Sequence, residues 1–254
     1  MGRTSAVLLL AALGACVPEG PAGGDGASAA APRPPPSPRP KPASTAPPRA
    51  DAAVVKAGAW ITSTFTDDFQ RAELGPDWNA LGKQWRIDSG RLCARGAKNH
   101  GIWLMRRLPV NARVEFDAVA ESPEGDIKAE LWGDGQSGAT GSSYNNATSY
   151  LTIFGGWRNT KHALARLDEH GEDRLELDVD PNSDDERARP ASPGQPYRFV
   201  IERRDGHTVT WTVNGVDYFE LDDAEPLSGE GHEHLGFNDW DAPVCFDNVK
   251  IEPR

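Results

Sequence analysis

The densest group of side chains that could do acid/base chemistry follows a predicted strand beyond the middle of the chain. Asp168, Glu169 and His170 stand together there, and a turn follows at Gly171. A histidine beside carboxylates can transfer protons as a general acid/base pair. If the protein is an enzyme, these three residues are its candidate catalytic groups. Charged residues also commonly end strands beside a glycine turn, and we favour this structural interpretation.

Other residues have the types that bind sugars. An aromatic face can stack on a pyranose ring, while planar polar groups bond to the hydroxyls. In the run 127–132 apolar side chains alternate with polar or aromatic ones, which predicts one polar strand face. We predict the following ligand-binding residues on this and later segments: Lys128, Glu130, Trp132, Trp157, Arg166, Asp168, Asn238 and Trp240. Core or rim packing is the alternative for the three tryptophans.

An acidic segment near residue 180 resembles the start of a calcium-binding loop, in which oxygen ligands occupy alternate positions. The ligands would be Asp178, Asp180, Asn182 and Asp184. Ser183, however, stands where such a loop needs glycine, and Arg189 stands where it needs a bidentate glutamate. We therefore interpret the segment as an acidic, mobile loop, with Ca²⁺ as the alternative. No other cofactor is predicted.

The charge of the chain limits its partners. It has 254 residues, enough to bury a large core, and a formal net charge of -11. Basic groups outnumber acids in the first 59 residues, so the remainder is strongly acidic. Binding to nucleic acid requires a basic face that neutralises phosphates. We therefore expect no nucleic-acid partner and assign the acidic surface to solubility.

Residues 1–15 have the features of a targeting segment. Arg3 provides a positive charge, residues 6–13 form an apolar stretch too short to span a bilayer, and small residues precede Cys16. Small residues before a cysteine resemble the lipobox of bacterial lipoproteins. The resemblance implies cleavage before Cys16, its acylation and a lipid anchor in the bacterial cell envelope, facing the periplasm or the surface. The alternative is an ordinary secretory signal with a chance cysteine.

Residues 16–59 are predicted to be a tether. After Cys16 they consist largely of Pro, Ala, Gly and Ser, and such a composition cannot form a core. Proline stiffens the segment, which would extend by ~3.1 Å per residue where it is polyproline-like. We predict a disordered spacer that holds the following domain away from the membrane.

Residues 60–254 are predicted to form one all-β domain. Many short alternating segments are joined by turns, and none shows a sustained apolar period of 3.6 residues with helix caps. Asn214-Gly215 lies between two alternating runs and predicts a hairpin, since both turn residues need positive φ. Trp211, in the first of these runs, is predicted to be in the core. A second hairpin is predicted across residues 88–90.

Three stretches carry a resemblance to a known fold family. They are Asp67-Asp-Phe69 with Trp78, the run 85–92, and the closing strand 246–251. They resemble the concanavalin A-like jelly rolls, which include laminin G-like modules, family-sixteen glycoside hydrolases and 3-keto-disaccharide hydrolase-like domains. The resemblance covers roughly residues 60–254. It implies a sandwich of two antiparallel sheets whose concave groove binds or cuts carbohydrate, but fold likeness alone does not transfer an activity.

The catalytic pattern of the family-sixteen hydrolases is incomplete in this chain. A retaining glycosidase uses two carboxyl groups ~5–5.5 Å apart, and this family supplies them from a Glu-x-Asp-x-Glu strand. Here Glu115 and Asp117 fit the first two acidic positions, but Val119 occupies the third. We therefore interpret Glu115 and Asp117 as residues on a solvent face.

The chain has three cysteines, and lipidation of Cys16 would leave two. Cys93 and Cys245 both lie in predicted strands of a protein expected in an oxidising compartment. We predict that they form a disulfide between an early strand and the last one.

The resulting functional prediction is a membrane-anchored lipoprotein whose β-sandwich binds a glycan or polysaccharide. One alternative is a glycoside or 3-keto-glycoside hydrolase that uses Asp168, Glu169 and His170 in the groove. The other is a non-catalytic adhesive or structural surface protein. Turnover would separate the first two hypotheses, and competition by free sugars would separate glycan binding from adhesion.

Overall fold

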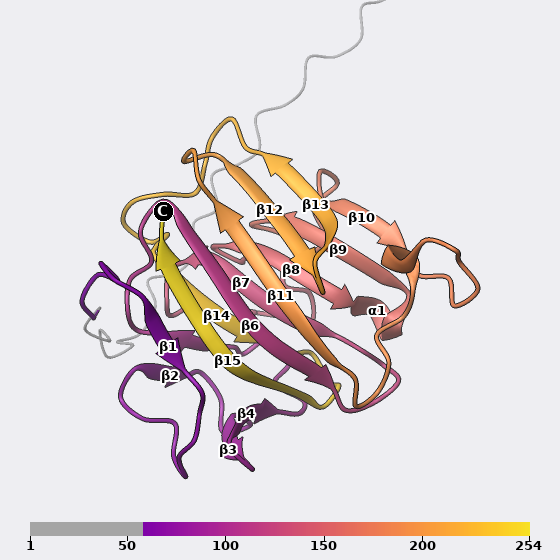
Figure 1. Cartoon of the computed structure of the whole chain (residues 1–254), viewed down its shortest axis with the longest axis horizontal. Coiled ribbons are helices and arrows are strands. Elements are labelled where there is room, and N and C mark those ends of the chain that lie inside the picture. The colour runs from indigo at the N-terminus through magenta and orange to yellow at the C-terminus, as the bar shows by residue number, and fades with distance from the viewer. Residues whose placement is uncertain (1–57) are drawn as a thin grey trace, which may run out of the picture. The chain divides into compact units, whose positions relative to one another are not determined.

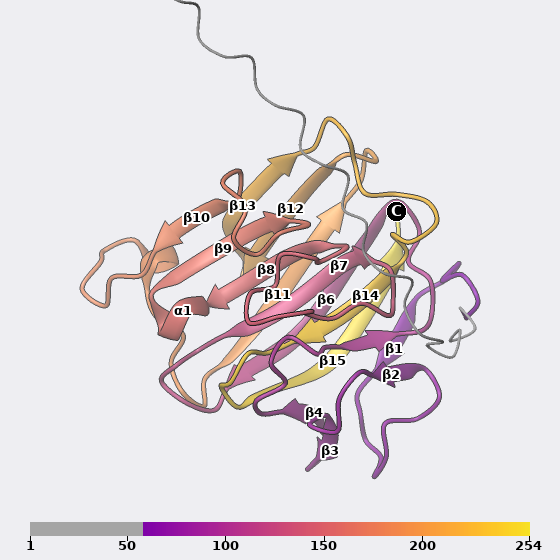
Figure 2. The ribbon, with the colours of Figure 1, turned by 180° about the vertical axis from the view of Figure 1, so that it is seen from behind.

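Two antiparallel β-sheets lie face to face in the computed structural model, which describes residues 58–254. Figure 1 looks onto the eight-stranded sheet, and Figure 2 looks onto the seven-stranded sheet on the opposite side. The predicted all-β jelly-roll sandwich is confirmed. The predicted signal segment, Cys16 and the tether up to residue 57 lie outside the described residues.

Each sheet takes strands from both the first and the second half of the domain. The eight-stranded sheet has the order β13 (Val216–Asp222), β12 (Thr208–Val213), β11 (Pro196–Arg203), β6 (Ala112–Ala120), β15 (Val244–Pro253), β4 (Arg91–Ala94) and β3 (Arg86–Asp88), and β1 (Phe65–Asp67) also pairs with β15. The seven-stranded sheet has the order β10 (Leu175–Asp178), β9 (Lys161–Arg166), β8 (Tyr150–Gly155), β7 (Ile127–Gly133), β14 (His234–Asn238), β5 (Ile102–Leu104) and β2 (Trp78–Ala80).

Helical structure is confined to short turns in the described residues. The single turn α1 (Gly156–Asn159) joins β8 to β9, and the 3₁₀ turn η1 (Glu186–Ala188) precedes β11. Within residues 58–254 no helix is long and apolar enough to cross a membrane.

An aromatic core joins the inner faces of the two sheets. Strand β6 buries every second residue, as its alternating sequence dictates. Its Phe116 stacks on Phe199 of β11 with ring centroids 5.0 Å apart, and meets Phe237 of β14 edge-on at 5.0 Å. Phe237 in turn stacks on Phe246 of β15 at 4.1 Å. These contacts hold the two sheets together, and each adds ~0.5–1.5 kcal/mol beyond the burial of area.

Both predicted hairpins are confirmed. Asn214 and Gly215 have φ values of 52° and 81°, the left-handed conformation that a two-residue turn between twisted strands requires. Ser89 and Gly90 between β3 and β4 have φ values of 54° and 75°. Trp211 of β12 is fully buried, as its apolar neighbours predicted.

The two carboxylates of the incomplete glycosidase pattern lie on the outer face of the eight-stranded sheet. The guanidinium of Arg198 donates to Glu115 at 2.9 Å and to Asp117 at 3.2 Å. Arg113 donates to Glu115 at 2.6 Å. The interpretation of Glu115 and Asp117 as residues on a solvent face is confirmed, and the structure adds that both are ion-paired.

The outer face of the seven-stranded sheet is covered by the long β7–β8 loop, residues 134–149. Tyr144 of this loop is fully buried and belongs to an apolar cluster with Leu151 and Ile153 of β8. The prediction of an open, polar sheet face around Glu130 is therefore wrong. The alternation in β7 does place Glu130 on this face, but the loop converts it into a buried layer.

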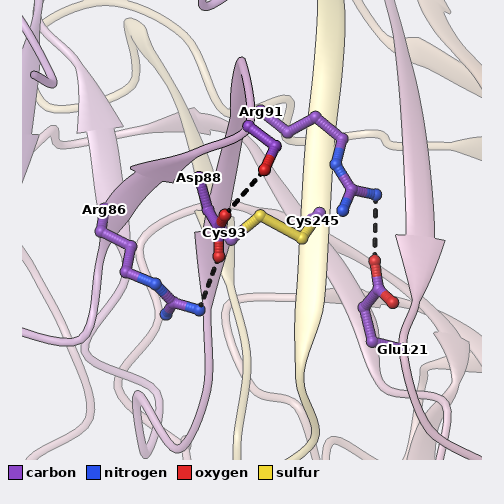
Figure 3. The surroundings of a disulfide bond; sticks show 7 residues. Arg86, Asp88, Arg91, Cys93, Glu121 and Cys245 are labelled. Atoms are coloured by element: carbon purple, nitrogen blue, oxygen red, sulfur yellow. Dashed lines mark hydrogen bonds and ion pairs between the residues drawn. A yellow bond between two sulfur atoms is a disulfide. The ribbon is translucent and has the colours of Figure 1, made fainter. Parts of the chain in front are cut away.

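The predicted disulfide between Cys93 and Cys245 is confirmed. The two residues are directly opposite each other on β4 and β15, with Cα atoms 4.1 Å apart. Figure 3 shows the disulfide with two ion pairs beside it, Arg86 with Asp88 and Arg91 with Glu121. The bond therefore ties the β3–β4 hairpin to the last strand of the sandwich.

Removal of the disulfide is predicted to cost substantial stability. The bond spans 152 residues of sequence, and in the chain-entropy model closing such a loop contributes about 4–5 kcal/mol. We expect the Cys93→Ala/Cys245→Ala double variant to lose most of this amount from its free energy of unfolding, measured by urea titration beside the oxidised and the reduced wild-type protein. A loss below about 1 kcal/mol in both the variant and the reduced protein would contradict the expectation.

Candidate functional site

A cleft of about 750 Å³ opens above the start of β7. The strand pairing places the β4–β5 loop, the β6–β7 turn, the β8–β9 turn and the β14–β15 loop at the same end of the sheets. The β7–β8 loop and the segment after β9 reach the cleft from the opposite end. The charged, amide and aromatic residues that line it are Arg95, Asn99, Glu124, Asp126, Lys128, Trp157, Arg158, Glu169, His170, Trp240 and Asp241.

The ammonium group of Lys128 lies buried at the floor of this cleft. Its Nζ is 2.8 Å from Glu169 Oε1, 3.1 Å from Asn99 Oδ1 and 3.4 Å from Asp126 Oδ1. The three N–H donors of the ammonium group therefore each have an acceptor. Burial alone would lower the pKa of Lys128, but the charges of Asp126 and Glu169 raise it above its ordinary value. Lys128 is consequently a structural cation rather than a base or a nucleophile.

The partners of Lys128 are also bonded to one another and to the backbone. Asn99 donates its amide N–H to Glu169 Oε2 at 3.3 Å, and the backbone N–H of Trp240 donates to Asp126 Oδ2 at 2.7 Å. Glu169 in turn donates its backbone N–H to the carbonyl of Tyr144 at 3.0 Å. We refer to Lys128, Asn99, Asp126 and Glu169 as the Lys128 cluster. Through it, segments from five parts of the chain share one bonded network.

Trp157 is carried on a left-handed turn. Trp157, Arg158 and Asn159 have φ values of 50°, 60° and 62°, a conformation that costs a non-glycine residue roughly 1 kcal/mol or more. The half-buried indole has the guanidinium of Arg174 5.2 Å from its centre, and the edge of His170 meets it at 5.8 Å. Strain of this kind is often found where a chain presents side chains for function.

Asn159 holds this turn in place. Its side-chain amide donates to the carbonyl groups of Pro123 at 2.9 Å and Ala191 at 2.8 Å, and its Oδ1 accepts the backbone N–H of Ala191 at 2.9 Å. Three hydrogen bonds from one side chain thus offset the backbone strain and fix where Trp157 points.

A second indole, that of Trp240, lies on the β14–β15 loop. It is half-buried and lines the cleft. The ammonium of Lys98 lies 4.7 Å from the centre of its ring and also pairs with Asp241 at 2.8 Å. The two tryptophans give the cleft two partly exposed aromatic faces.

Beneath the cleft, Glu130 is buried together with its hydrogen-bond donors. Tyr144 Oη donates to Glu130 Oε2 at 2.9 Å, Ser149 Oγ donates to the same atom at 2.8 Å, and Asn238 Nδ2 donates to Oε1 at 2.7 Å. These bonds favour the ionised form, but burial outweighs them and raises the pKa of Glu130 to about 7. The carboxyl group therefore attaches the β7–β8 loop to the sheet.

A neighbouring acid, Asp239, has a similarly altered environment. Burial and then the charge of Asp126 raise its pKa to about 7. Its Oδ2 accepts the backbone N–H of Ala97 at 3.0 Å, whereas Oδ1 has no hydrogen-bond partner among the described residues. Asp239 therefore supports the β4–β5 loop from below.

The structure separates the predicted ligand-binding residues into three groups. Lys128, Trp157 and Trp240 line the cleft. Glu130 and Asn238 are fully buried beneath it. The others lie elsewhere, as the following paragraphs describe.

The predicted position of Trp132 on the polar face of β7 is wrong. Its side chain is fully buried in the core between the sheets, where its Nε1 donates to the carbonyl of Pro109 at 3.0 Å and the guanidinium of Arg203 lies 4.0 Å from its ring centre. The pairing of β7 with β14 shifts register here, and Trp132 has a φ of 54°. This β-bulge interrupts the alternation and turns the indole to the opposite face.

Arg166 and Asp168 are also misplaced by the sequence prediction, because neither lines the cleft. Arg166 donates to Asp223 Oδ2 at 2.7 Å and to the carbonyl of Glu225 at 2.6 Å, which ties the end of β9 to the segment after β13. Asp168 accepts the backbone N–H of His170 at 2.8 Å and so stabilises a turn.

The three candidate catalytic residues do not converge on one point. Glu169 points to Lys128, Asp168 caps its own turn, and His170 is exposed against Trp157. Only Glu169 and His170 of the three line the cleft. The arrangement agrees with the structural interpretation of this charged turn.

The four candidate calcium ligands do not form a cluster either. Asp178 pairs with Lys161 at 2.7 Å, and Asp180 accepts the backbone N–H of Asn182 at 2.9 Å. Among residues 58–254 no group of three or more Asp, Glu, His or Cys side chains is arranged to hold a metal ion. The geometry therefore gives the calcium hypothesis no support.

Several cleft residues escaped the sequence analysis. Asn99, Asp126 and Arg158 lie in short connections without a repeating pattern. All three have positive φ, at 57°, 68° and 60°. Nothing in the sequence signals that Asn99 and Asp126 meet at Lys128, since these contacts join distant loops. The alternating run 127–132, which contains Lys128, is the sequence pattern that indicates part of the cleft.

Comparisons with known proteins agree on the fold alone. No protein-family model matches the sequence, and no curated protein matches it. A Bacillus subtilis protein of unknown function with a galectin-like fold is similar at a TM-score of 0.51 and 13% identity, over 74% of this chain and 94% of the other. The carbohydrate-binding module CBM66 from Bacillus subtilis is similar at 0.50 and 13%, over 69% and 95%.

A third similar structure is that of an endo-acting O-glycanase from the human gut microbiota. Its TM-score is 0.50 at 11% identity, with 75% of this chain and 98% of the other covered. At such identities these likenesses establish the class of fold, a galectin-like jelly-roll sandwich.

The buried carboxyl of Glu130 predicts a pH dependence of stability. The folded protein holds this proton more tightly than the unfolded chain, so the stabilisation is fully present below pH 4.5 and is lost as the pH rises through about 7. We expect the difference in unfolding free energy between the wild type and Glu130→Gln to fall across this window, by at most about 1.4 kcal/mol per pH unit. Urea titrations at several pH values measure it.

The exposed Glu230 provides the matched control. Glu230→Gln should follow the wild type at every pH. A wild-type minus Glu130→Gln difference that stays constant from pH 4.5 to 7 would contradict the assigned environment of Glu130.

Proposed function

We propose that the protein binds a glycan in the cleft above the Lys128 cluster. The observation that carries the proposal is the pairing of two partly exposed indoles, Trp157 and Trp240, with carboxylate and amide groups in one cleft of about 750 Å³. Sugar rings present C–H faces that stack on aromatic side chains and hydroxyls that need planar polar partners.

The polar groups of the cleft are suited to hydroxyl recognition. Asp126 and Glu169 are acceptors whose positions are fixed by Lys128, and each carboxylate has more lone pairs than these bonds use. Because the network is formed before a ligand arrives, little side-chain entropy is lost on binding.

The similarity of fold supports glycan binding less strongly than the cleft does. The similar CBM66 is a carbohydrate-binding module, and the similar O-glycanase acts on glycans, as their names say. The candidate catalytic residues Asp168, Glu169 and His170 point in different directions, so binding without turnover is the function that we carry forward. The adhesive alternative differs from it in that free sugars would not compete.

We further propose that the domain is displayed on the bacterial cell envelope. The support is the sequence alone: small residues before Cys16, and a proline-rich segment between Cys16 and the domain. Two or more acyl chains on one residue suffice for stable anchoring, whereas a single chain does not.

The binding proposal predicts the effect of removing the indoles. Trp157→Ala and Trp240→Ala should each weaken glycan binding by about 2 kcal/mol or more, roughly thirtyfold, because buried aromatic anchors dominate such interfaces. A glycan-array screen with the full chain identifies the ligand, and calorimetry measures the affinities.

The control is Trp60→Ala, since Trp60 is 45% exposed and lies outside the cleft. It should bind like the wild type. Unchanged affinity in both cleft variants, or equal losses in all three, would place the binding site elsewhere.

The anchoring proposal has its own test. After expression in a bacterial host that processes lipoproteins, the wild type should partition into the detergent phase and Cys16→Ala into the aqueous phase. Mass spectrometry of the mature N-terminus should find the acyl chains on Cys16. Aqueous partitioning of the wild type would reject the anchor without affecting the binding proposal.

A further inference from the structure

Two arginines that line the cleft lack a carboxylate partner, unlike most arginines of the domain. Most arginines of residues 58–254 lie within 4.0 Å of a carboxylate. In this part of the chain the ones without such a partner are Arg95, Arg158, Arg189 and Arg203. Arg203 is buried and donates to two backbone carbonyl groups. Arg189 is exposed on the loop after η1. Arg95 and Arg158 line the cleft.

Their lack of partners is unexpected from composition. Asp and Glu outnumber Lys and Arg in the chain by 38 to 27, so a carboxylate should be easy for any surface arginine to find. Exposed guanidinium groups held apart from carboxylates are available for a charged ligand.

Both arginines are attached to fixed backbone. Arg158 lies between Trp157 and Asn159 in the left-handed turn, which the three hydrogen bonds of Asn159 hold in place. Arg95 follows β4 two residues after Cys93, whose disulfide joins that strand to β15. A ligand would therefore meet two guanidinium groups whose neighbouring backbone is held by the hydrogen bonds of Asn159 and by the disulfide.

The carboxylates of the cleft are mostly neutralised. Asp126 and Glu169 share Lys128, and Asp241 pairs with Lys98 at 2.8 Å. These three carboxylates face two ammonium groups, so the set keeps one residual negative charge, which lies in the buried Lys128 cluster.

Glu124 is the acidic residue of the cleft that has no basic partner within 4.0 Å in residues 58–254. The hydroxyl of Ser122 and its own backbone lower its pKa, and the charges of Arg158 and Arg95 lower it further. Both arginines therefore lie on the side of the cleft where Glu124 stands. One unpaired carboxylate and two unpaired guanidinium groups give this side of the cleft one positive charge, which balances the residual negative charge of the Lys128 cluster.

We propose that the cleft selects an anionic saccharide, one whose rings carry carboxylate or sulfate groups. This rests on the proposed glycan binding and specifies its ligand class. The planar fork of a guanidinium matches the two oxygens of a carboxylate or sulfate, and charge-assisted bonds of this kind are about twice as strong as neutral ones. Trp157 and Trp240 would stack on the rings while Arg95 and Arg158 bind the acidic substituents.

The experiment compares ligands in matched pairs. One pair is a galacturonate oligosaccharide and its methyl ester, and the other is a sulfated galactan oligosaccharide and its desulfated form. Calorimetry with the full chain should find the acidic member of at least one pair bound more than tenfold more tightly than its neutral form. The pair that shows the preference tells whether carboxylate or sulfate is recognised.

The protein variants assign the preference to the two arginines. Arg95→Gln/Arg158→Gln should bind the acidic and neutral forms equally, whereas Arg189→Gln, an unpaired arginine outside the cleft, should keep the wild-type preference. Raising the salt from ~0.01 M to ~1 M shortens the screening length from about 30 Å to about 3 Å and should weaken only the acidic ligand.

The outcomes separate this proposal from the binding proposal. Equal binding of acidic and neutral forms by the wild type, with both lost in Trp157→Ala, rejects anion selection and keeps glycan binding. A preference that persists in Arg95→Gln/Arg158→Gln also rejects it. If no member of either pair binds and the glycan array shows no ligand, both proposals are rejected.

Discussion

The buried ammonium of Lys128 is the interaction on which the cleft depends. Leaving one partner of a buried ion pair alone typically costs 3–5 kcal/mol, so the cluster is stable only while Asp126, Glu169 and Asn99 remain in place around it. Those three residues belong to the β6–β7 turn, the segment after β9 and the β4–β5 loop. The need to pair this one buried charge therefore fixes the positions of these three loops relative to one another. The hydrogen bonds of the sheets alone would not position them.

Other constraints act on the same loops from outside the cluster. The Cys93–Cys245 disulfide lies close in sequence to two residues that line the cleft. Cys93 comes two residues before Arg95, and Cys245 comes two residues after Pro243. Asn159 fixes the turn that carries Trp157, and Glu130 fixes the loop that covers the neighbouring sheet face. A rigid sandwich with a preformed loop cleft suits recognition of a ligand by shape and polarity, as binding modules require.

The parts of this structure that could be predicted from sequence are those that depend on local patterns. Strand alternation placed Trp211 in the core, Asn214-Gly215 indicated a hairpin, and the two remaining cysteines indicated the disulfide. Trp132 shows where such reasoning fails, since a single bulge reversed its face without any sequence signal. The closure of the sheet face by residues 134–149 and the meeting of Asn99 with Lys128 arise from tertiary contacts between distant loops. No local period encodes contacts of that kind.

The most direct test of the account is to observe the indole N–H resonances of the eight tryptophans by NMR while adding the tightest-binding oligosaccharide from the array. The resonances of Trp157 and Trp240 should shift together at the same ligand concentration. Those of the core residues Trp103, Trp132 and Trp211 should stay unchanged, because they are fully buried away from the cleft. Shifts confined to tryptophans outside the cleft, with Trp157 and Trp240 unchanged, would contradict the central claim that this cleft is the glycan-binding site.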